Sequence, residues 1–318
     1  MALPPRGAAL TRRLLVDTDT ASDDAVALLL ALRTPGVEVA AVTVVAGNVP
    51  LEQAVQNALY TVELAGVPVP VHVGRGEPRA QPLVTAQEVH GADGMGDVGL
   101  PLSGREPAPG DAVGVLVESV RAAPGELELV TLGPLTNVAE AFERAPDVPR
   151  ALRRVVVMGG TSDAVGNQTP VAEYNVWADP EAAAVVFASG APLVMVGWDV
   201  SRKWAVFEAD EAERLRALGP LGAFAVEIQA TLDGFAREES GLPGFDLPDP
   251  IAMAVALDPA VATEVRRLHV AVELDGKLTR GMTVVDHLGW GSGEPNVDVV
   301  LAADRERFLA LLHGALAS

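Results

Sequence analysis

The sequence predicts an α/β protein with a mostly parallel, Rossmann-like central sheet and helices on both faces. Short runs rich in β-branched residues alternate with longer Ala/Leu-rich runs along most of the chain. The short runs are almost continuously apolar, which is typical of parallel strands covered by helices on both sides. Unusual polar residues follow several of these runs, where ligands bind in such sheets.

The first expected strand, 14–19, precedes a helix over 22–36 that Pro35 and Gly36 end. The expected elements that follow are a strand over 37–48, a helix over 51–66, a strand over 69–74, a helix over 111–122, a strand over 127–133, a helix over 135–145, a strand over 155–160, a helix over 179–189 and a strand over 192–200. A partly inserted helical region over 207–244, a helix over 249–258 and a β-rich C-terminal stretch over 266–286 complete the pattern. We expect a single domain over 1–318, with 1–12 as a frayed tail.

The composition narrows the function classes. The chain has 318 residues, 49% of them hydrophobic, with 23 basic and 43 acidic residues and a net charge of −20. Such acidity repels nucleic-acid phosphates and anionic membranes, so we expect neither as a partner. The lack of cysteine excludes disulfides, zinc–thiolate sites and cysteine nucleophiles. Because no run resembles a signal peptide or a membrane span, we expect a cytoplasmic protein.

The segment LLVDTDTASDD crowds four carboxylates into the first strand–helix junction. Ser22 is a good N-cap residue, and a helix N-terminus favours the charges of Asp23 and Asp24. That explanation leaves Asp17 and Asp19 at the end of an apolar strand, where unpaired charges are costly and repel one another. A divalent cation removes the conflict, and oxygen ligands without cysteine favour Ca²⁺ or Mg²⁺.

The same segment allows a second interpretation. A strand followed by D-x-D-x-T opens the haloacid-dehalogenase-like phosphatases, which would make this chain a Mg²⁺-dependent phosphatase. Here Ala21 stands four residues after Asp17, where Thr or Val is expected, and no later pair of acids follows a strand in the expected way. This interpretation therefore ranks second.

A series of motifs continues along the chain: DTDTASDD, AVTVVAGN, HGADGMGD, LVTLGPLTN, VVVMGG, GNQTPVAEYNVWADPEAA, LPDPIAMA and GKLTRGMTVVD. In this order they resemble the inosine–uridine-type nucleoside hydrolases over nearly the whole chain, although Thr20-Ala21 replaces the usual Pro-Gly. The resemblance implies hydrolysis of the N-glycosidic bond of ribonucleosides to ribose and free base, with bound Ca²⁺. It also implies a role in nucleoside salvage and a homo-oligomer, either a dimer or a tetramer.

The resemblance also assigns residues. Calcium ligands would be the side chains of Asp19, Asp24 and Asp249 and the carbonyl of Leu132, with Asp246 as a competing ligand. Ribose would be bound by Asp23, Asn48, Asn167, Glu173 and Asn175. Asp19 is the candidate general base, and His90 matches a histidine near the leaving base. Taken alone, Asn48 also fits an ordinary turn residue, and Glu173 and Asn175 fit ordinary loop residues.

One position departs from the family pattern. Many members have a histidine directly before the metal-binding aspartate, but Pro248 stands there in this chain and cannot donate a proton. Either His90 or another group assists the leaving base, or an aromatic ring stacks on it, with Trp204 and Trp177 as the residues to inspect. The departure leaves the base preference open. It also keeps a third hypothesis, a nucleoside- or ribose-binding protein without turnover.

Overall fold

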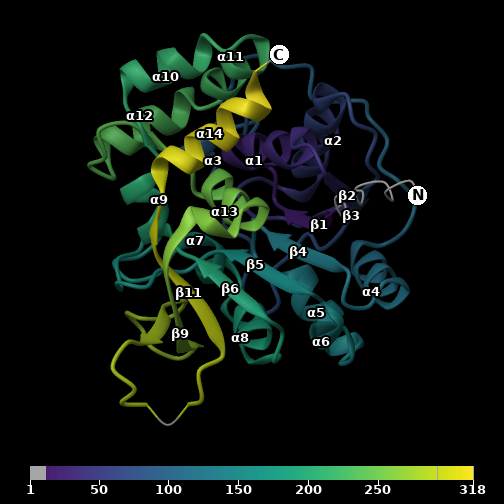
Figure 1. Cartoon of the computed structure of the whole chain (residues 1–318), viewed down its shortest axis with the longest axis vertical. Coiled ribbons are helices and arrows are strands. Elements are labelled where there is room, and N and C mark those ends of the chain that lie inside the picture. The colour runs from purple at the N-terminus through teal and green to yellow at the C-terminus, as the bar shows by residue number, and fades with distance from the viewer. Residues whose placement is uncertain (1–11, 292, 318) are drawn as a thin grey trace, which may run out of the picture.

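A computed structural model describes residues 12–291 and 293–317 and confirms the α/β fold (Figure 1). Its nine-stranded sheet has the order β10-β9-β11-β6-β5-β4-β1-β2-β3. All neighbours from β11 to β3 pair in parallel, whereas β9 and β10 pair antiparallel at the other edge. The strands are β1 (Arg12–Thr18), β2 (Val37–Val44), β3 (Val71–Val73), β4 (Leu127–Thr131), β5 (Arg154–Met158), β6 (Leu193–Val196), β9 (Ala262–Val272), β10 (Thr283–Asp286) and β11 (Val297–Ala303).

Helices cover both faces of this sheet (Figure 1). One face packs against α1 (Ser22–Arg33), α2 (Leu51–Ala65), α13 (Pro248–Leu257) and α14 (Arg305–Leu316). The other packs against α4 (Ala112–Ala122), α5 (Thr136–Arg144), α6 (Val148–Ala151) and α8 (Pro180–Ala188). In β1 the two-residue period is visible, because Leu14 and Val16 join the first core and Leu15 joins the second.

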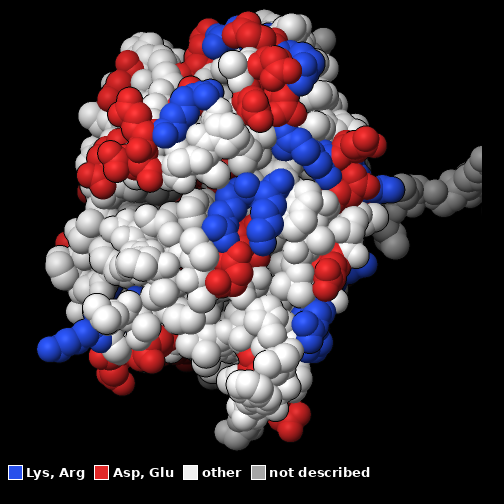
Figure 2. Space-filling model, turned by 90° about the vertical axis from the view of Figure 1, so that its left-hand side faces the viewer, with Lys and Arg blue, Asp and Glu red and all other residues white. Residues whose placement is uncertain are grey.

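The expected helical region is also present. It contains α10 (Ala209–Arg216), α11 (Pro220–Glu227) and α12 (Ala230–Glu238), next to a small antiparallel pair, β7 (Val206–Phe207) and β8 (Phe245–Asp246). Figure 2 shows Lys and Arg side chains lying beside Asp and Glu side chains, most densely at the top of the view. Arg214 pairs with Asp210 at 2.9 Å, and Arg305 pairs with Glu211 at 2.6 Å. The described residues of this face therefore form no continuous basic surface of the kind that binds a phosphate backbone.

The sequence interpretation differs from the structure at several places. The strand expected over 192–200 ends at Val196, because the chain turns at Gly197 into α9 (Trp198–Trp204). The last strand and helix, β11 and α14, were not expected at all, although Asp304 caps α14 by accepting from the Arg307 N–H. Residues 1–11 of the expected tail lie outside the described residues. The tail expectation is wrong for Arg12, which already belongs to β1.

No helix in the described part of the chain is both long and apolar enough to cross a membrane. The remaining helices are short: α3 (Gln87–His90), α7 (Tyr174–Ala178) and α9, with a 3₁₀ turn over Pro259–Val261. All three short helices lie close to the carboxyl ends of the parallel strands, and each contributes residues to the cavity described below.

A buried ion pair ties the beginning of β1 to the centre of the sheet. Glu128 is 3% exposed and accepts from Arg12 at 2.6 Å and from Arg154 at 2.7 Å. The two guanidinium groups hold the pKa of Glu128 below its ordinary value, against the opposing effect of burial. Both arginines also donate to the Ala256 carbonyl at the end of α13.

We expect Glu128→Ala to lower the free energy of unfolding by about 3 kcal/mol, because it leaves two partly buried cations without their anion. Denaturant unfolding measures this change. Glu126→Ala is the matched control, since Glu126 is 67% exposed and 3.8 Å from Arg13. Glu126→Ala should lower the free energy of unfolding by less than about 0.5 kcal/mol. Equal effects of the two substitutions would contradict a structural role for the buried pair.

Candidate active site

A cavity lies beyond the carboxyl ends of the central parallel strands. It contains every residue that the sequence assigned to ribose, together with the candidate for the leaving base and two of the candidate metal ligands: Asp23, Asn48, Asn167, Glu173, Asn175, His90, Leu132 and Asp249. We call it the acidic cavity. The position agrees with the rule that ligands of parallel α/β sheets bind beyond the carboxyl ends of the strands.

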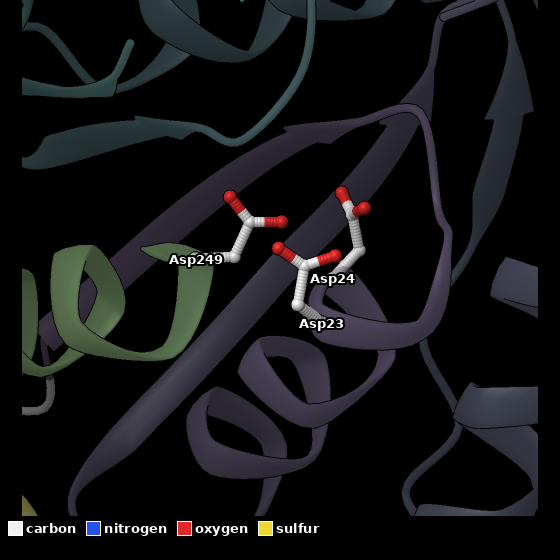
Figure 3. Close-up of side chains that lie close together, drawn as sticks. All are labelled: Asp23, Asp24 and Asp249. Atoms are coloured by element: carbon white, nitrogen blue, oxygen red, sulfur yellow. The ribbon is translucent and has the colours of Figure 1, made fainter. Parts of the chain in front are cut away.

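Three buried carboxylates lie close together at the acidic cavity, and two of them, Asp23 and Asp249, line it. Asp23 and Asp24 come from the first turn of α1, and Asp249 comes from the first turn of α13 (Figure 3). One oxygen of each lies within 4.8 Å of the others, a spacing that suits a shared cation. This group contains Asp24 and Asp249 from the predicted metal set and adds Asp23, which the sequence had assigned to ribose.

Asp24 is held rigidly from the protein side. One of its carboxylate oxygens accepts from the Thr18 hydroxyl at 2.5 Å, and the other accepts from the Ala21 N–H at 2.9 Å. Ala21 therefore occupies the N-cap position of α1, and Ser22 is the first helical residue rather than the expected cap. The chain uses the Asp24 carboxylate to bind the N–H of its own cap residue, which leaves the Ser22 hydroxyl free for another partner.

Asp19 lies in a narrow space between two glycines. A Cβ on Gly47 would come within 2.1 Å of Asp19 Oδ2, and a Cβ on Gly133 would come within 2.6 Å of Asp19 Oδ1. Oδ2 accepts from the Asn48 N–H at 2.6 Å, whereas Oδ1 is buried without a partner among the described residues. Asp19 is not part of the close group of three, but it is near enough to raise the pKa of Asp249. Its assignment as a metal ligand stays a prediction.

Asp17 has a different role from its neighbours. Its Oδ2 accepts from the Thr43 hydroxyl at 2.6 Å and from the Asn137 amide at 2.9 Å. Asn137 in turn accepts from the Arg75 N–H at 2.9 Å. Asp17 thus connects β1, β2 and α5 behind the acidic cavity.

Burial and mutual repulsion make this cluster unstable in its fully ionised form. Burial raises the pKa of both Asp23 and Asp24 to about 7, and repulsion between neighbouring carboxylates adds to the effect. The same causes, with burial the larger, raise the pKa of Asp19 and Asp249 well above the ordinary value. A divalent cation would reverse the balance by stabilising the charged forms.

The oxygen atoms in and beside the cavity suit a hard cation as ligands. Within the group of three, Asp23 Oδ1 has no hydrogen-bond partner in the described part of the chain, and the buried oxygens Asp19 Oδ1 and Asn175 Oδ1 have none either. The predicted carbonyl ligand, Leu132 O, accepts from the Asn175 amide at 2.8 Å and keeps a second lone pair. An all-oxygen set with carboxylate charge suits Ca²⁺ or Mg²⁺ better than zinc or copper.

Three of the ribose candidates, Asn167, Glu173 and Asn175, lie in or next to the turn that leads into α7. Glu173 caps α7 by accepting from the N–H groups of Asn175 and Val176, and it also accepts from the Gly160 N–H at 2.7 Å. Asn167 accepts from the Tyr174 N–H at 2.9 Å, which fixes the loop between β5 and α7. These contacts combine a structural role with a position on the wall of the acidic cavity.

His90 reaches the cavity from the C-terminal end of α3. It is 7% exposed, and its Nδ1 lies 2.9 Å from the Ser22 hydroxyl and 3.8 Å from an Asp23 carboxylate oxygen. Burial lowers the pKa of His90 to about 4, so the ring is neutral near pH 7. The sequence found His90 by its motif but gave no indication of the contact with Ser22.

The aromatic residues expected near the base are corrected by the structure. Neither Trp204 nor Trp177 lines the acidic cavity; Tyr174, Trp198 and Phe235 do. Trp177 packs beside Tyr174 and Ala86 in a small cluster, and Trp204 packs against the larger core. Trp198 and Phe235 belong to α9 and α12, and the sequence interpretation found no functional signal in either residue.

Asp246, the competing metal ligand, also lines the cavity but is bound elsewhere. Its Oδ2 accepts from the Trp198 indole N–H at 3.1 Å and from the Ser201 hydroxyl at 2.7 Å. It lies outside the close group of three carboxylates. Pro248 stands on the same wall, at the first turn of α13.

Fold and site together describe an α/β protein with a carboxylate-rich ligand cavity, and comparison with known proteins gives the family. Residues 14–310 match the family described as inosine-uridine preferring nucleoside hydrolase. The chain is 39% identical to the pyrimidine-specific ribonucleoside hydrolase RihA of Salmonella enteritidis over 302 residues, which cover 94% of this chain and 96% of that protein.

Solved structures agree. A plant nucleoside hydrolase, PpNRh1, superposes with a TM-score of 0.90 at 33% identity, covering 97% of this chain and 99% of that chain. A purine-preferring ribonucleoside hydrolase from Gardnerella vaginalis gives a TM-score of 0.88 at 32% identity, covering 96% and 98%. The chain belongs to the inosine-uridine preferring nucleoside hydrolase family and is an enzyme of the nucleoside hydrolase type.

We expect Gly47→Ala to lower kcat/KM by roughly 10²-fold, because the added methyl displaces the Asp19 carboxylate by about an ångström. Steady-state nucleoside hydrolysis measures the loss. Gly114→Ala in α4 is the control, since its nearest contact would be 4.0 Å away and the activity should not change. Normal activity of Gly47→Ala would contradict the close packing around Asp19.

The raised pKa values also predict how stability depends on pH. Without a cation, Asp23 and Asp24 bind protons in the folded state up to about pH 7, whereas the unfolded chain releases them near 3.8. EDTA-treated protein should therefore lose stability as the pH rises from about 4 to about 7. Added Ca²⁺ should raise the melting temperature, and more so at about pH 8 than at about pH 5.

Differential scanning calorimetry with Ca²⁺ and with EDTA at both pH values measures this effect. Asp24→Asn is the comparison variant, because it keeps the side-chain shape and removes one charge from the group of three. Asp24→Asn should reduce the increase in melting temperature that Ca²⁺ causes. An increase of the same size at both pH values would contradict the proposed link between carboxylate protonation and cation binding.

Proposed function

We propose that this chain hydrolyses the N-glycosidic bond of ribonucleosides, with a divalent cation, Ca²⁺ by the family resemblance, bound by Asp24, Asp249, the Leu132 carbonyl and Asp19. The observation that carries the proposal is the close group of Asp23, Asp24 and Asp249, two of which line the cavity that every predicted ribose-binding residue also lines. When bound, the cation supplies positive charge that lowers the pKa of an attacking water.

Asp19 is the general base of the proposal. One of its oxygens is occupied by the Asn48 N–H, while Oδ1 is buried and unpartnered among the described residues. Oδ1 is therefore the oxygen available to accept a proton from water. The glycines on either side keep this carboxylate in one orientation.

The ribose-binding residues have a second task. Cleavage of an N-ribosidic bond builds positive charge on the sugar, as in other glycoside hydrolyses. Asp23 and Glu173 are carboxylates on the cavity wall, and Asn48, Asn167 and Asn175 offer amides that suit the sugar hydroxyls. Together they would orient the ring and stabilise the developing charge.

A substrate assay decides whether the enzyme prefers purine or pyrimidine nucleosides. The relative from Salmonella is named pyrimidine-specific, whereas the structural neighbour from Gardnerella is named purine-preferring. The proposal therefore covers ribonucleosides in general. Nucleoside salvage, a cytoplasmic location and a dimeric or tetrameric state stay predictions from the resemblance.

A substrate panel tests the proposal. Purified protein is incubated with inosine, adenosine, guanosine, uridine and cytidine, each with Ca²⁺ and with EDTA, and reducing sugar and free base are measured. We expect calcium-dependent release, and Asp19→Asn should lower kcat by roughly 10²- to 10⁴-fold. Its melting temperature in EDTA should be no lower than that of the parent, because the substitution removes one of the buried carboxylates that repel one another. Undiminished turnover by Asp19→Asn would remove the general-base assignment. Phosphate release from phosphorylated substrates, or tight nucleoside binding without turnover, would favour one of the two alternatives.

A further inference from the structure

The hydroxyl of Ser22 has one partner in the described part of the chain, and that partner is His90. Ser22 is fully buried, and its Oγ lies 2.9 Å from His90 Nδ1. Its position is fixed from the other side as well, because the Gln229 amide donates to the Ser22 carbonyl at 3.0 Å. A serine that does not cap its helix thus joins α1 to the histidine on the wall of the acidic cavity.

The surroundings fix the direction of this hydrogen bond. A buried hydroxyl proton needs an acceptor, and His90 Nδ1 is the acceptor within reach. The nearest carboxylate oxygen of Asp23 is 3.8 Å from Nδ1, too far to accept a proton from the ring instead. Ser22 therefore donates, Nδ1 accepts, and the proton of the neutral imidazole is on Nε2.

The Nε2 atom is available to a ligand. His90 lines the acidic cavity, and its Nε2 has no hydrogen-bond partner among the described residues. The Nε2 atom also keeps some accessible surface, so it reaches the open space of the cavity. The ring consequently presents an N–H donor to whatever occupies that space.

Near His90, the polar side-chain hydrogens of Tyr174 and Trp198 are already used, whereas the amides of Asn48 and Asn167, which are free among the described residues, belong to the proposed ribose-binding set. The Tyr174 hydroxyl donates to the Val84 carbonyl at 2.8 Å, and the Trp198 indole N–H donates to Asp246. Pro248 has neither a side-chain donor nor a backbone N–H. Apart from the ribose-binding amides, His90 is the one of these cavity residues with a free donor.

We propose that Ser22 is a positioning residue that holds His90 as the Nε2–H tautomer, so that His90 donates a hydrogen bond to an acceptor atom of the departing base. The inference rests on the proposed function and deepens it. The C1′–N bond breaks with its electron pair on the base, and a C1′–O bond forms to water. The water proton passes to Asp19, and the base takes its proton from solvent. The His90 N–H stabilises the anionic base during this step without giving up its proton.

The tautomer is measured directly by ¹⁵N NMR of protein labelled at histidine, with Ca²⁺ present and no substrate. His90→Gln assigns the signals. We expect the Nε2–H pattern in the parent and in Ser22→Thr, which keeps the hydroxyl, and a mixture of tautomers in Ser22→Ala. An Nδ1–H pattern in the parent would overturn the inference. An Nε2–H pattern that is unchanged in Ser22→Ala would overturn it as well. This experiment needs no turnover, so its result is separate from that of the proposed function.

Kinetics test the consequence for the leaving group. With a nucleoside, Ser22→Ala should lower kcat by roughly tenfold, the worth of about one hydrogen bond. With 4-nitrophenyl riboside, whose leaving group departs readily as an anion, the loss should be less than about twofold. Ser22→Thr should keep the parent rate on both substrates. Equal losses on both substrates would show that Ser22 acts through the carboxylates next to it, and would overturn the inference.

Two further variants keep the test decisive. Ser22→Cys has nearly the same size and a weaker donor, and it replaces Ser22→Ala if the latter does not fold. Ser189→Ala removes a hydroxyl from the end of α8, where it donates to the Val186 carbonyl at 2.7 Å, outside the acidic cavity. It should match the parent with both substrates. If the parent hydrolyses neither substrate, the proposed function fails, while the NMR result still decides the tautomer.

Discussion

Several buried carboxylates held close together without a basic partner are the constraint on which the centre of this structure depends. Asp19, Asp23, Asp24 and Asp249 are at most 5% exposed, and burial raises the pKa of each. Hydroxyl and backbone donors satisfy all or part of two of these groups, as Thr18 and Ala21 do for Asp24 and as the Asn48 N–H does for Asp19. Asp23 and Asp249 line the cavity, where the proposed cation and a polar substrate would supply the missing partners. The repulsion among these buried carboxylates is therefore a property of the protein without its ligands.

The sheet was largely predictable because its strands are continuously apolar and its helices have clear ends. The prediction failed where tertiary context decided the outcome. The chain turns at Gly197 after β6, and a helix begins at Trp198, although the letters PLVMVGWDV are typical of one strand. The segment VDVVLAADRERFLALL contained the usual signals for a strand, a capping aspartate and an amphipathic helix, and those signals were missed.

The site residues were predictable only through motifs, and their geometry was not. The series of motifs identified Asp23, Asn48 and Glu173, which all line the cavity. Nothing in the local sequence could reveal that Ser22 contacts His90, because the contact joins the start of α1 to the end of α3, far apart in the chain. The choice between Trp177 and Trp198 as a cavity residue likewise depends on how α7 and α9 pack, which a single sequence does not encode locally.

The packing of α1 against α13 has a consequence for how the protein is made. Asp24 leaves the ribosome early and Asp249 late, and the last strand, β11, lies between β9 and β6 rather than at an edge. A nascent chain therefore carries its N-terminal acids for most of synthesis before their partners exist. In the proposed function, a cation shared by Asp24 and Asp249 can be held only after α13 has docked on α1, so its binding would report the completion of folding.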